Sequence, residues 1–308
     1  MRLPENLRGW AAPVAGAAAP WAWFAARDTT ASFDEVAVFL PAIVLLGIVA
    51  VTAVAARKLK PALAVVAASL VVFGALVVLG PRMPIGGPAP IDPVHLVSSN
   101  AYDHNPSPAQ GVRNLLDRNP DVLVAVETTP LFRVDLFRSF PYRAENNAIG
   151  VFSDWPLALL PNPEGIPTSQ AIRVQVAAPS GSFVLYAVHA SNPLHDTSFG
   201  AALVTVQRIK AAAASERLPV VLAGDFNETD RSQAYRTLAS AFRDAMRAGW
   251  AGSTYEKGIF RLFQLRIDNV FITRTWCAAD AATFPVSGSD HEALDVRVGP
   301  CPEAVPGS

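Results

Sequence analysis

Two long apolar segments near the start of the chain constrain its fold more than any other feature. Residues 36–56 read VAVFLPAIVLLGIVAVTAVAA and residues 61–80 read PALAVVAASLVVFGALVVLG, and neither contains a charged side chain. A helix of about 20 residues crosses the hydrocarbon core of a bilayer, which is about 30 Å thick. A buried helix in a soluble protein normally keeps a polar face, and neither segment has one. We therefore expect both to span a membrane, which explains why 51% of the chain is hydrophobic and only 17% charged.

Residues 10–26 form a third, weaker candidate span. The segment is uncharged, but it is short, rich in alanine and interrupted by Pro13 and Pro20. Its three tryptophans suit the headgroup region of a membrane. A helix lying in the interface and a signal-like segment are the alternatives. No small-residue cleavage site followed by a soluble stretch is evident, so we expect no removable signal peptide and place the membrane region at residues 1–80.

Basic residues predict the orientation of the spans. Arg57, Lys58 and Lys60 fill the loop between the two strong candidates, whereas residues 27–35 hold one arginine against three acidic residues. By the positive-inside rule, the loop at 57–60 is cytoplasmic. The chain after residue 80 then lies outside the cytoplasm, as in a multi-pass protein of the cell membrane with an extracytoplasmic domain.

A change in composition marks where that domain begins. Residues 81–93, PRMPIGGPAPIDP, contain too much proline and glycine to continue a helix and predict a linker. Residues 94–299 have the length of one α/β domain, and residues 300–308 form a C-terminal tail. From Met83 onward 22 acidic residues outnumber 18 basic ones, without a basic stripe. This charge disfavours tight, sequence-independent binding of nucleic acid, but it does not exclude a nuclease that holds phosphate through a metal ion.

Short apolar runs alternate with helical spacing in the domain. The runs predict strands at residues 95–100, 121–127, 148–153, 171–177, 183–189, 219–223, 267–273 and 292–298. Apolar residues at helical spacing predict helices at residues 110–118, 201–217 and 232–238. This order indicates mixed β-sheets covered by helices.

Polar residues suited to catalysis stand at the ends of these strands. The apolar run from Val221 stops at Gly224-Asp-Phe-Asn227, and Ser289-Asp-His291 enters from a later loop. A buried strand that delivers Asp225 and Asn227 to its tip builds a polar site on a rigid support. The alternative is an ordinary turn, because Gly, Asp and Asn are common turn residues.

Four further polar residues at strand ends each have a structural alternative. Glu127 ends a mostly apolar run, where a carboxylate is costly to bury unless a cation compensates it, but it could also emerge into solvent. Asn100 and His189, taken singly, are more often turn or structural residues. Asp268 could orient a histidine or could form a salt bridge with Arg266.

The order of these motifs resembles that of the endonuclease/exonuclease/phosphatase superfamily, which includes deoxyribonuclease I, neutral sphingomyelinases and apurinic endonucleases. The resemblance covers about residues 94–298 and is most specific at Gly224-Asp-Phe-Asn227, Arg266-Ile-Asp268 and Ser289-Asp-His291. It implies an α/β fold, a four-layer sandwich of two mixed β-sheets flanked by helices. It also implies hydrolysis of a phosphodiester or phosphomonoester with a divalent metal. Apolar spans followed by such a domain resemble the membrane-anchored members found in bacteria.

The resemblance implies a metal site and names its residues. Asn100 and Glu127 would help to hold the ion, usually Mg²⁺ with Mn²⁺ as the alternative, and Asp290 would lie at the metal or in its water shell. Mg²⁺ prefers hard oxygen ligands and keeps several waters, so that one or two carboxylates suffice.

The remaining residues are expected to carry the catalysis. By the resemblance, Asp225 and Asn227 orient the attacking water and the phosphate. Asp268 pairs with His291, which contacts the scissile phosphate. His189 matches a histidine of the deoxyribonuclease I and sphingomyelinase branches, where apurinic endonucleases have a tyrosine.

Several substrates fit this enzyme: extracellular nucleic acid, a phospholipid head group or a soluble phosphoester. Nucleic acid is expected only as a substrate, and no stable protein partner is predicted. Phe260, Phe263 and Trp250 could contact a membrane or could belong to the core. A non-catalytic binding domain of the same fold is the rival interpretation. A transporter or sensor is disfavoured because neither strong span contains an ionisable residue.

The two cysteines, Cys277 and Cys301, are expected to form a disulfide, because such bonds persist outside the cytoplasm. Both stand near the ends of the last two predicted strands. By the resemblance, these strands carry Asp268 and His291, so the bridge would hold the site on a fixed scaffold. Two unpaired, partly buried thiols are the alternative.

Overall fold

The computed structural model describes residues 5–55, 61–146, 148–192 and 200–302, which belong to two compact units. One unit covers the chain up to Arg82 together with Arg231–Gln233, and the other covers Met83–Asp230 and the chain from Ala234 onward. The two units are described separately below.

The first unit is helical. It contains α1 (Glu5–Ala26), α2 (Ala31–Ala55) and α3 (Pro61–Phe73), and α3 continues through a π-helical segment (Gly74–Leu79) and a 3₁₀ turn (Gly80–Arg82). Phe73 is fully buried, and its ring meets that of Trp21 edge to face with 5.3 Å between centroids. The indole nitrogen of Trp21 donates to Ser69 Oγ at 3.0 Å, which links α1 to α3.

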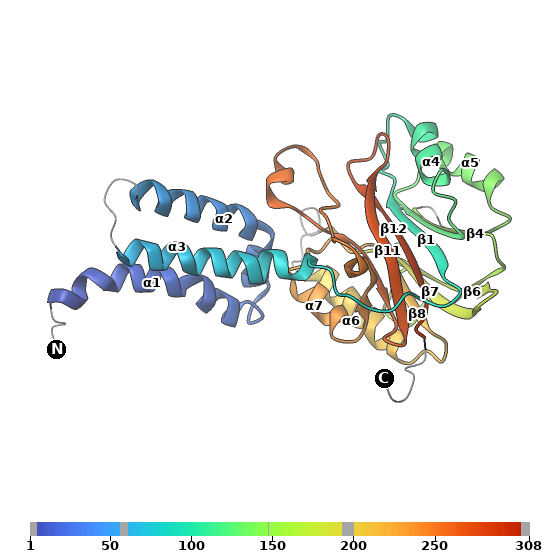
Figure 1. Ribbon diagram of the computed structural model, residues 1–308. Coiled ribbons are helices and arrows are strands. Elements are labelled where there is room, and N and C mark those ends of the chain that lie inside the picture. Colours follow the sequence, from blue (N-terminus) through green and yellow to red (C-terminus); the bar gives the residue numbers. More distant parts are fainter. Residues whose placement is uncertain (1–4, 56–60, 147, 193–199, 303–308) are drawn as a thin grey trace. The chain divides into compact units, whose positions relative to one another are not determined.

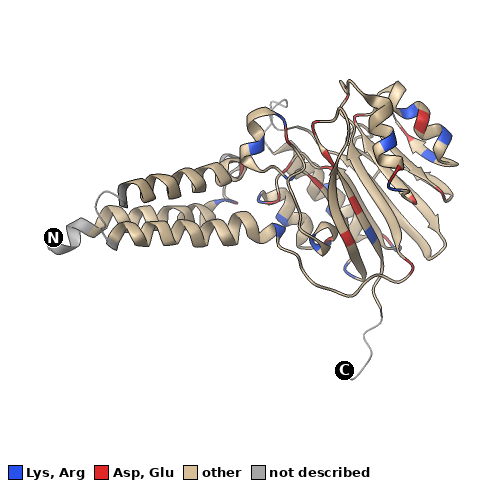
Figure 2. Ribbon diagram, turned by 45° about the horizontal axis from the view of Figure 1, so that its top comes forward, with Lys and Arg blue, Asp and Glu red and all other residues tan. Residues whose placement is uncertain are grey.

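Two stretches of this unit, Asp34–Ala53 and Ala62–Arg82, are long and apolar enough to cross a membrane, judged by length and composition alone. Figure 2 shows few charged residues along these helices. Helix α1 contains both prolines of the third candidate and is not among the stretches that meet this criterion within the described residues. Arg57, Lys58 and Lys60, on which the predicted orientation depends, lie outside the described residues.

The second unit contains two six-stranded mixed sheets. The first has the order β11 (Trp276–Pro285), β12 (Glu292–Pro300), β1 (Val94–Asn100), β2 (Val122–Val126), β4 (Ile149–Ser153) and β3 (Tyr142–Glu145). The second has the order β5 (Leu157–Leu160), β6 (Ala171–Ala178), β7 (Gly181–His189), β8 (Val220–Asp225), β10 (Asp268–Ile272) and β9 (Arg243–Asp244). The pairs β1–β2 and β7–β8 are parallel, and the other neighbouring pairs are antiparallel.

Helices cover the outer face of each sheet (Figure 1). Helices α4 (Pro108–Leu116) and α5 (Pro130–Ser139) pack on the first sheet, and α6 (Ala201–Ala214) and α7 (Gln233–Ala239) pack on the second. Helix α5 begins at a cap in which Thr129 Oγ1 accepts a hydrogen bond from Phe132 N at 3.2 Å. The result is the four-layer α/β sandwich expected from the sequence, which is confirmed.

Alternation along the central strands explains why their sequences are apolar throughout. In β2, Val122 and Val124 point into the core between the sheets, whereas Leu123 packs under α4 and α5. In β8, Val221 lies in the central core and Leu222 under α6 and α7. A strand that is buried on both faces needs an apolar side chain at every position.

The segment before β1 contacts the second unit along its length. Ile85 N donates to Arg247 O at 2.7 Å, and Ile91 N donates to Pro300 O at 2.8 Å. Arg247 Nε also donates to Met83 O at 3.0 Å. The proline- and glycine-rich segment is therefore attached to the sandwich from Met83 onward.

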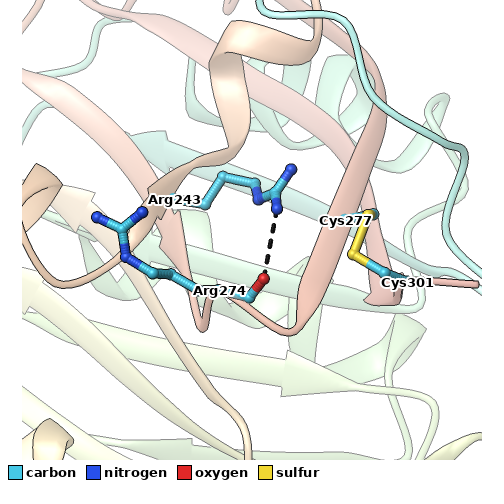
Figure 3. Close-up of a disulfide and its surroundings, with 4 residues drawn as sticks. All are labelled: Arg243, Arg274, Cys277 and Cys301. Carbon is cyan, nitrogen blue, oxygen red and sulfur yellow. Dashed lines mark hydrogen bonds between the residues drawn. A yellow bond between two sulfur atoms is a disulfide. The ribbon is translucent and has the colours of Figure 1, made fainter. Parts of the chain in front are cut away.

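The disulfide between Cys277 and Cys301 is present, with 4.9 Å between the Cα atoms (Figure 3). Its location differs from the prediction. Cys277 lies in β11, a strand that the sequence did not predict, and Cys301 follows the C-terminal end of β12. Asp268 is in the other sheet, and His291 precedes the opposite end of β12, about 30 Å of extended chain away. The bridge thus fastens β11 to β12 at the end of β12 away from His291, and it does not hold the predicted pair Asp268 and His291.

Candidate active site

Three adjacent strands of the second sheet place polar side chains in one row. His189 ends β7 and is paired in register with Asp225, which ends the parallel strand β8. Asp225 is in turn opposite Asp268 at the start of the antiparallel strand β10. The sheet register alone therefore brings an imidazole and two carboxylates to the same edge.

The first sheet brings its residues to the same place. Asn100 ends β1, Glu127 follows the parallel strand β2, and His291 precedes β12, which is antiparallel to β1. The Asn100 side-chain amide joins the two sheets: its Nδ2 donates to Glu127 Oε1 at 2.8 Å and to Asp225 Oδ2 at 3.0 Å. Its Oδ1 accepts from the backbone nitrogen of Tyr102 at 2.9 Å. Asn100 thus presents its nitrogen, and not its oxygen, to the carboxylates.

The backbone at the site adopts conformations that L-residues rarely take. Glu127, directly after β2, and Asn227, two residues after the end of β8, both have φ near +52°. Gly224 has φ +136°, and a Cβ atom there would lie 2.0 Å from Val188 O of the neighbouring strand β7. Such conformations persist where the surrounding structure enforces them, and they gather at functional sites.

Glu127 and His189 form an ion pair in which Nε2 lies 3.1 Å from Oε1. Burial alone would raise the pKa of Glu127, but hydrogen bonds with His189 and Asn100 outweigh it and lower that pKa to about 2. Burial would lower the pKa of His189, yet its hydrogen bond with Glu127 gives a net increase. The pair is therefore a carboxylate beside an imidazole that favours its protonated form.

His291 and Asp268 form a second, more deeply buried pair. His291 Nδ1 lies 2.8 Å from Asp268 Oδ2, and both side chains are almost inaccessible. Burial would lower the pKa of His291, but the charges of Asp268 and Asp225 raise it to about 9. Thr254 Oγ1 accepts hydrogen bonds from the backbone nitrogens of Ile267 and Asp268, which fixes the start of β10.

Asp225 lies between these pairs and is fully buried. Burial raises its pKa to about 6, and the charge of Asp268 adds to this increase. Its Oδ1 accepts a hydrogen bond from Asn227 N at 2.7 Å, and Asn227 Nδ2 donates to Ala190 O at 2.7 Å. The predicted motif Gly224–Asn227 therefore forms a turn that fixes its own aspartate.

Asp290 lies in a cluster with two residues that sequence analysis missed. Lys257 Nζ lies 3.1 Å from Asp290 Oδ2 and 3.2 Å from the hydroxyl of Tyr102. Both partners come from loops, and no strand pattern marks them. The proposed alternative for Asp268 is wrong, because Arg266 pairs with Asp244 at 2.7 Å and 2.8 Å instead.

The donor set fits a divalent cation. Two overlapping groups, Glu127–His189–Asp225 and Asp225–Asp268–His291, each present one candidate ligand atom per residue within 4.8 Å of one another. Carboxylate oxygens are the ligands that hard cations such as Mg²⁺ prefer. The clustered negative charge, three carboxylates against two imidazoles, is also what a cation would offset.

Residues 95–291 match the Endonuclease/Exonuclease/phosphatase family. The chain belongs to this family. Members of the family are metal-dependent nucleases and phosphatases, and the carboxylate and histidine groups described above could bind the metal.

Solved structures with the same fold share little sequence with this family member. A family protein from Beutenbergia cavernae is 17% identical with a TM-score of 0.51, covering 68% of this chain and 72% of its own. A conserved protein of unknown function from Enterococcus faecalis is 14% identical with a TM-score of 0.54, covering 67% and 99%. A humanized TDP2 from D. rerio is 17% identical with a TM-score of 0.52, covering 67% and 99%. No curated protein matches the chain.

Proposed function

We propose that the protein is a membrane-anchored phosphoesterase that uses Mg²⁺ to hydrolyse a phosphodiester or phosphomonoester outside the cytoplasm. The observation that carries the proposal is the convergence of Asn100 and Glu127 from one sheet with His189, Asp225 and Asp268 from the other. Every one of these residues stands at a strand end, and hydrogen bonds connect them across the two sheets.

Each side chain has a role that its contacts support. Asp225, a buried carboxylate in contact with Asn100 and Asn227, accepts a proton from the attacking water. The water oxygen adds to phosphorus while the ester P–O bond breaks, and His189 gives a proton to the departing alcohol. His291, which Asp268 keeps protonated, faces the phosphoryl oxygens.

The metal role falls to Glu127 and Asp290. When bound, the cation would neutralise the charge that develops on the phosphoryl oxygens. Asn100 holds Glu127 and Asp225 in place through its amide nitrogen, and its Oδ1, which accepts a hydrogen bond from Tyr102 N, would be the atom that it offers to the ion. Asn227 orients the phosphate from the turn after β8.

The location of the enzyme is part of the same proposal. Residues 36–56 and 61–80 serve as spans of the membrane region 1–80, residues 10–26 join them as a third span, and residues 94–299 form the catalytic domain. The two apolar helical stretches support the anchoring. The basic loop at 57–60 supports an extracytoplasmic domain.

The proposal is tested with the full-length chain in detergent and bis-p-nitrophenyl phosphate, with Mg²⁺, with Mn²⁺ and with EDTA. We expect Asp225→Asn and His291→Gln each to lower kcat by about 10²–10⁴-fold, because each removes a proton-transfer or charge-stabilising group. His95→Gln is the matched control, since His95 pairs with Asp295 at 2.7 Å at the opposite end of β1. It should leave the rate unchanged.

Two results would overturn the proposal. Turnover that is insensitive to EDTA and to Glu127→Ala would remove the metal role. Binding of phosphoesters without turnover, for the esters above and for DNA and RNA, would favour the non-catalytic binding domain. Nucleic acid belongs in the substrate panel because one structural neighbour, 16% identical with a TM-score of 0.50, is a 3′ phosphatase from Neisseria bound to product DNA.

A further inference from the structure

The loop formed by residues 253–265, here called the 253–265 loop, is attached to the candidate active site at its base. Backbone nitrogens of Thr254 and Tyr255 both donate to Leu265 O, at 2.8 Å and 3.0 Å, which closes the loop. Glu256 N donates to Asp290 O at 3.1 Å. Tyr255 also forms an isolated β-bridge with His291. The position of this loop is therefore fixed by the catalytic residues themselves.

A chain of aromatic rings supports the outer part of the loop. The Tyr255 ring lies edge to face on His291 with 5.0 Å between centroids. Phe260 follows at 5.8 Å from Tyr255, and Phe263 at 5.9 Å from Phe260. Phe260 and Phe263 are only partly exposed. The two phenylalanines considered above as membrane-contact or core residues are thus packed against each other, and Phe260 against Tyr255.

The same segment exposes two aliphatic side chains. Residues 258–263 form a 3₁₀ helix, η4 (Gly258–Phe263), in which residues three apart lie on the same side. Ile259 and Leu262 are three apart, and they are 66% and 64% exposed. A single exposed aliphatic residue needs no explanation, but a pair on one side of a supported helix beside a catalytic site marks an interaction surface.

Basic groups flank this aliphatic pair. Lys257 precedes the helix and lies against Asp290 and Tyr102, and its side chain is 51% exposed. Arg261 lies between the two aliphatic residues in the chain, with Nη2 3.0 Å from Glu256 Oε2. The 253–265 loop therefore presents exposed aliphatic surface beside two cations, each paired with a carboxylate, next to His291.

We propose that the 253–265 loop binds an amphiphilic phosphoester, a phospholipid within a lipid surface, with Ile259 and Leu262 among the acyl chains and the phosphate toward Lys257 and His291. This inference rests on the proposed function and specifies its substrate. In the reaction, one water adds to phosphorus and one ester P–O bond breaks. The alcohol oxygen takes the proton, which gives an alcohol and a phosphate monoester.

The alternative of nucleic acid is less well matched by this surface. Single-stranded nucleic acid is held by aromatic stacking platforms and basic grooves, whereas the most exposed apolar groups of η4 are aliphatic and its phenylalanines are only partly exposed. Acidic residues also outnumber basic ones from Met83 onward. Two helical stretches are long and apolar enough to cross a membrane, which would keep the protein close to lipid.

The test compares hydrolysis of three probes by the full-length chain: phosphatidylglycerol in mixed micelles with a non-ionic detergent, bis-p-nitrophenyl phosphate, and a single-stranded oligonucleotide. We expect the double variant Ile259→Ser/Leu262→Ser to lower kcat/KM for the phospholipid by about tenfold or more, which corresponds to about 1.4 kcal/mol of lost apolar contact. The rate on the soluble ester should stay the same, which also shows that the variant is folded. Leu159→Ser is the matched control, because Leu159 is 62% exposed in the edge strand β5. It should change none of the rates.

The outcomes separate this inference from the proposed function. If the soluble ester is cleaved but the phospholipid is not, or if the double variant leaves phospholipid hydrolysis unchanged, the inference fails and the phosphoesterase stands. An equal loss of kcat/KM for the phospholipid and for the oligonucleotide would also overturn the inference, since the loop would then contribute to the site without selecting lipid. If no probe is cleaved with Mg²⁺ or Mn²⁺, the proposed function fails and the inference with it.

Discussion

Gly224 is a single residue that allows strands β7 and β8 to approach each other closely. Its φ of +136° and the 2.0 Å between a hypothetical Cβ and Val188 O mean that β7 and β8 approach at a point where no side chain fits. The next residue is Asp225, so the position of this carboxylate in the candidate site depends on this contact.

We expect Gly224→Ala to destabilise the protein strongly, because it adds a backbone clash to the strain of a positive φ, which alone costs about 1–3 kcal/mol. Gly181→Ala is the matched control: Gly181 has φ +126° but nothing within 4 Å of its Cβ position. Denaturant unfolding of both variants measures the difference. Equal losses would contradict the steric role assigned to Gly224.

The positive charge of His291 contributes to the stability of the folded protein. Its pKa of about 9 in the folded protein exceeds the ordinary value of 6.5, so its pairing with Asp268 stabilises the fold fully below about pH 6.5. That contribution is lost as the pH rises through about 9. We expect Asp268→Asn to lower the His291 pKa, as measured by NMR titration of the metal-free protein. A His291 pKa that does not move in Asp268→Asn would show that other groups hold the charge.

Whether a strand could be predicted from the sequence depends on its place in the sheet. The strands β1, β2, β4, β6, β7, β8, β10 and β12 were predicted, and they are the interior strands of both sheets. The four edge strands β3, β5, β9 and β11 were not predicted. Interior strands such as β2 and β8 are apolar on both faces, whereas β5 is exposed at its two middle residues and β11 is an alanine-rich run with a bulge near Asp280. Burial on both faces requires apolar residues and so creates the pattern from which strands were predicted. Edge strands are more exposed and lack that pattern.

Some residues of the candidate site could be predicted from the sequence, and others could not. The residues at strand tips could be predicted, because a long apolar run makes its polar terminus conspicuous. Tyr102, Thr254 and Lys257 could not, because they come from loops whose positions are set by tertiary contacts such as Tyr255 on His291. Helix α5 was also missed, although Thr129 and Pro130 form a helix-start pattern that could have revealed it.

The disulfide between β11 and β12 is expected to stabilise the fold. Cys277→Ser should lower the free energy of unfolding by about 2–4 kcal/mol, since the bridge closes a loop across a sequence separation of 24 residues. The rate on bis-p-nitrophenyl phosphate should not change under conditions where the variant stays folded, because the bridge lies at the end of β12 away from His291. Cys301→Ser should behave identically. Loss of turnover without loss of folding would show that the bridge acts on the site.

Under the proposed function, the orientation of residues 1–80 in the membrane decides on which side of that membrane the enzyme works. We expect alkaline phosphatase fused after Val298 to be active in cells, because it folds only outside the cytoplasm, and a fluorescent protein that folds only in the cytoplasm to be dark at the same position. Replacing Arg57, Lys58 and Lys60 by neutral residues should weaken this preference. The reverse pattern of reporters would place the domain in the cytoplasm.

The hydrogen bond between Ile91 and Pro300 has a consequence for protein engineering. Because the chain just before β1 lies beside the end of β12, the chain on either side of this hydrogen bond can be joined by a short linker and new ends opened at an exposed turn. The turn between β6 and β7, at Pro179 and Ser180, is such an opening. The same adjacency makes the sandwich portable: it can be inserted into a surface loop of an unrelated host without pulling the host's chain apart.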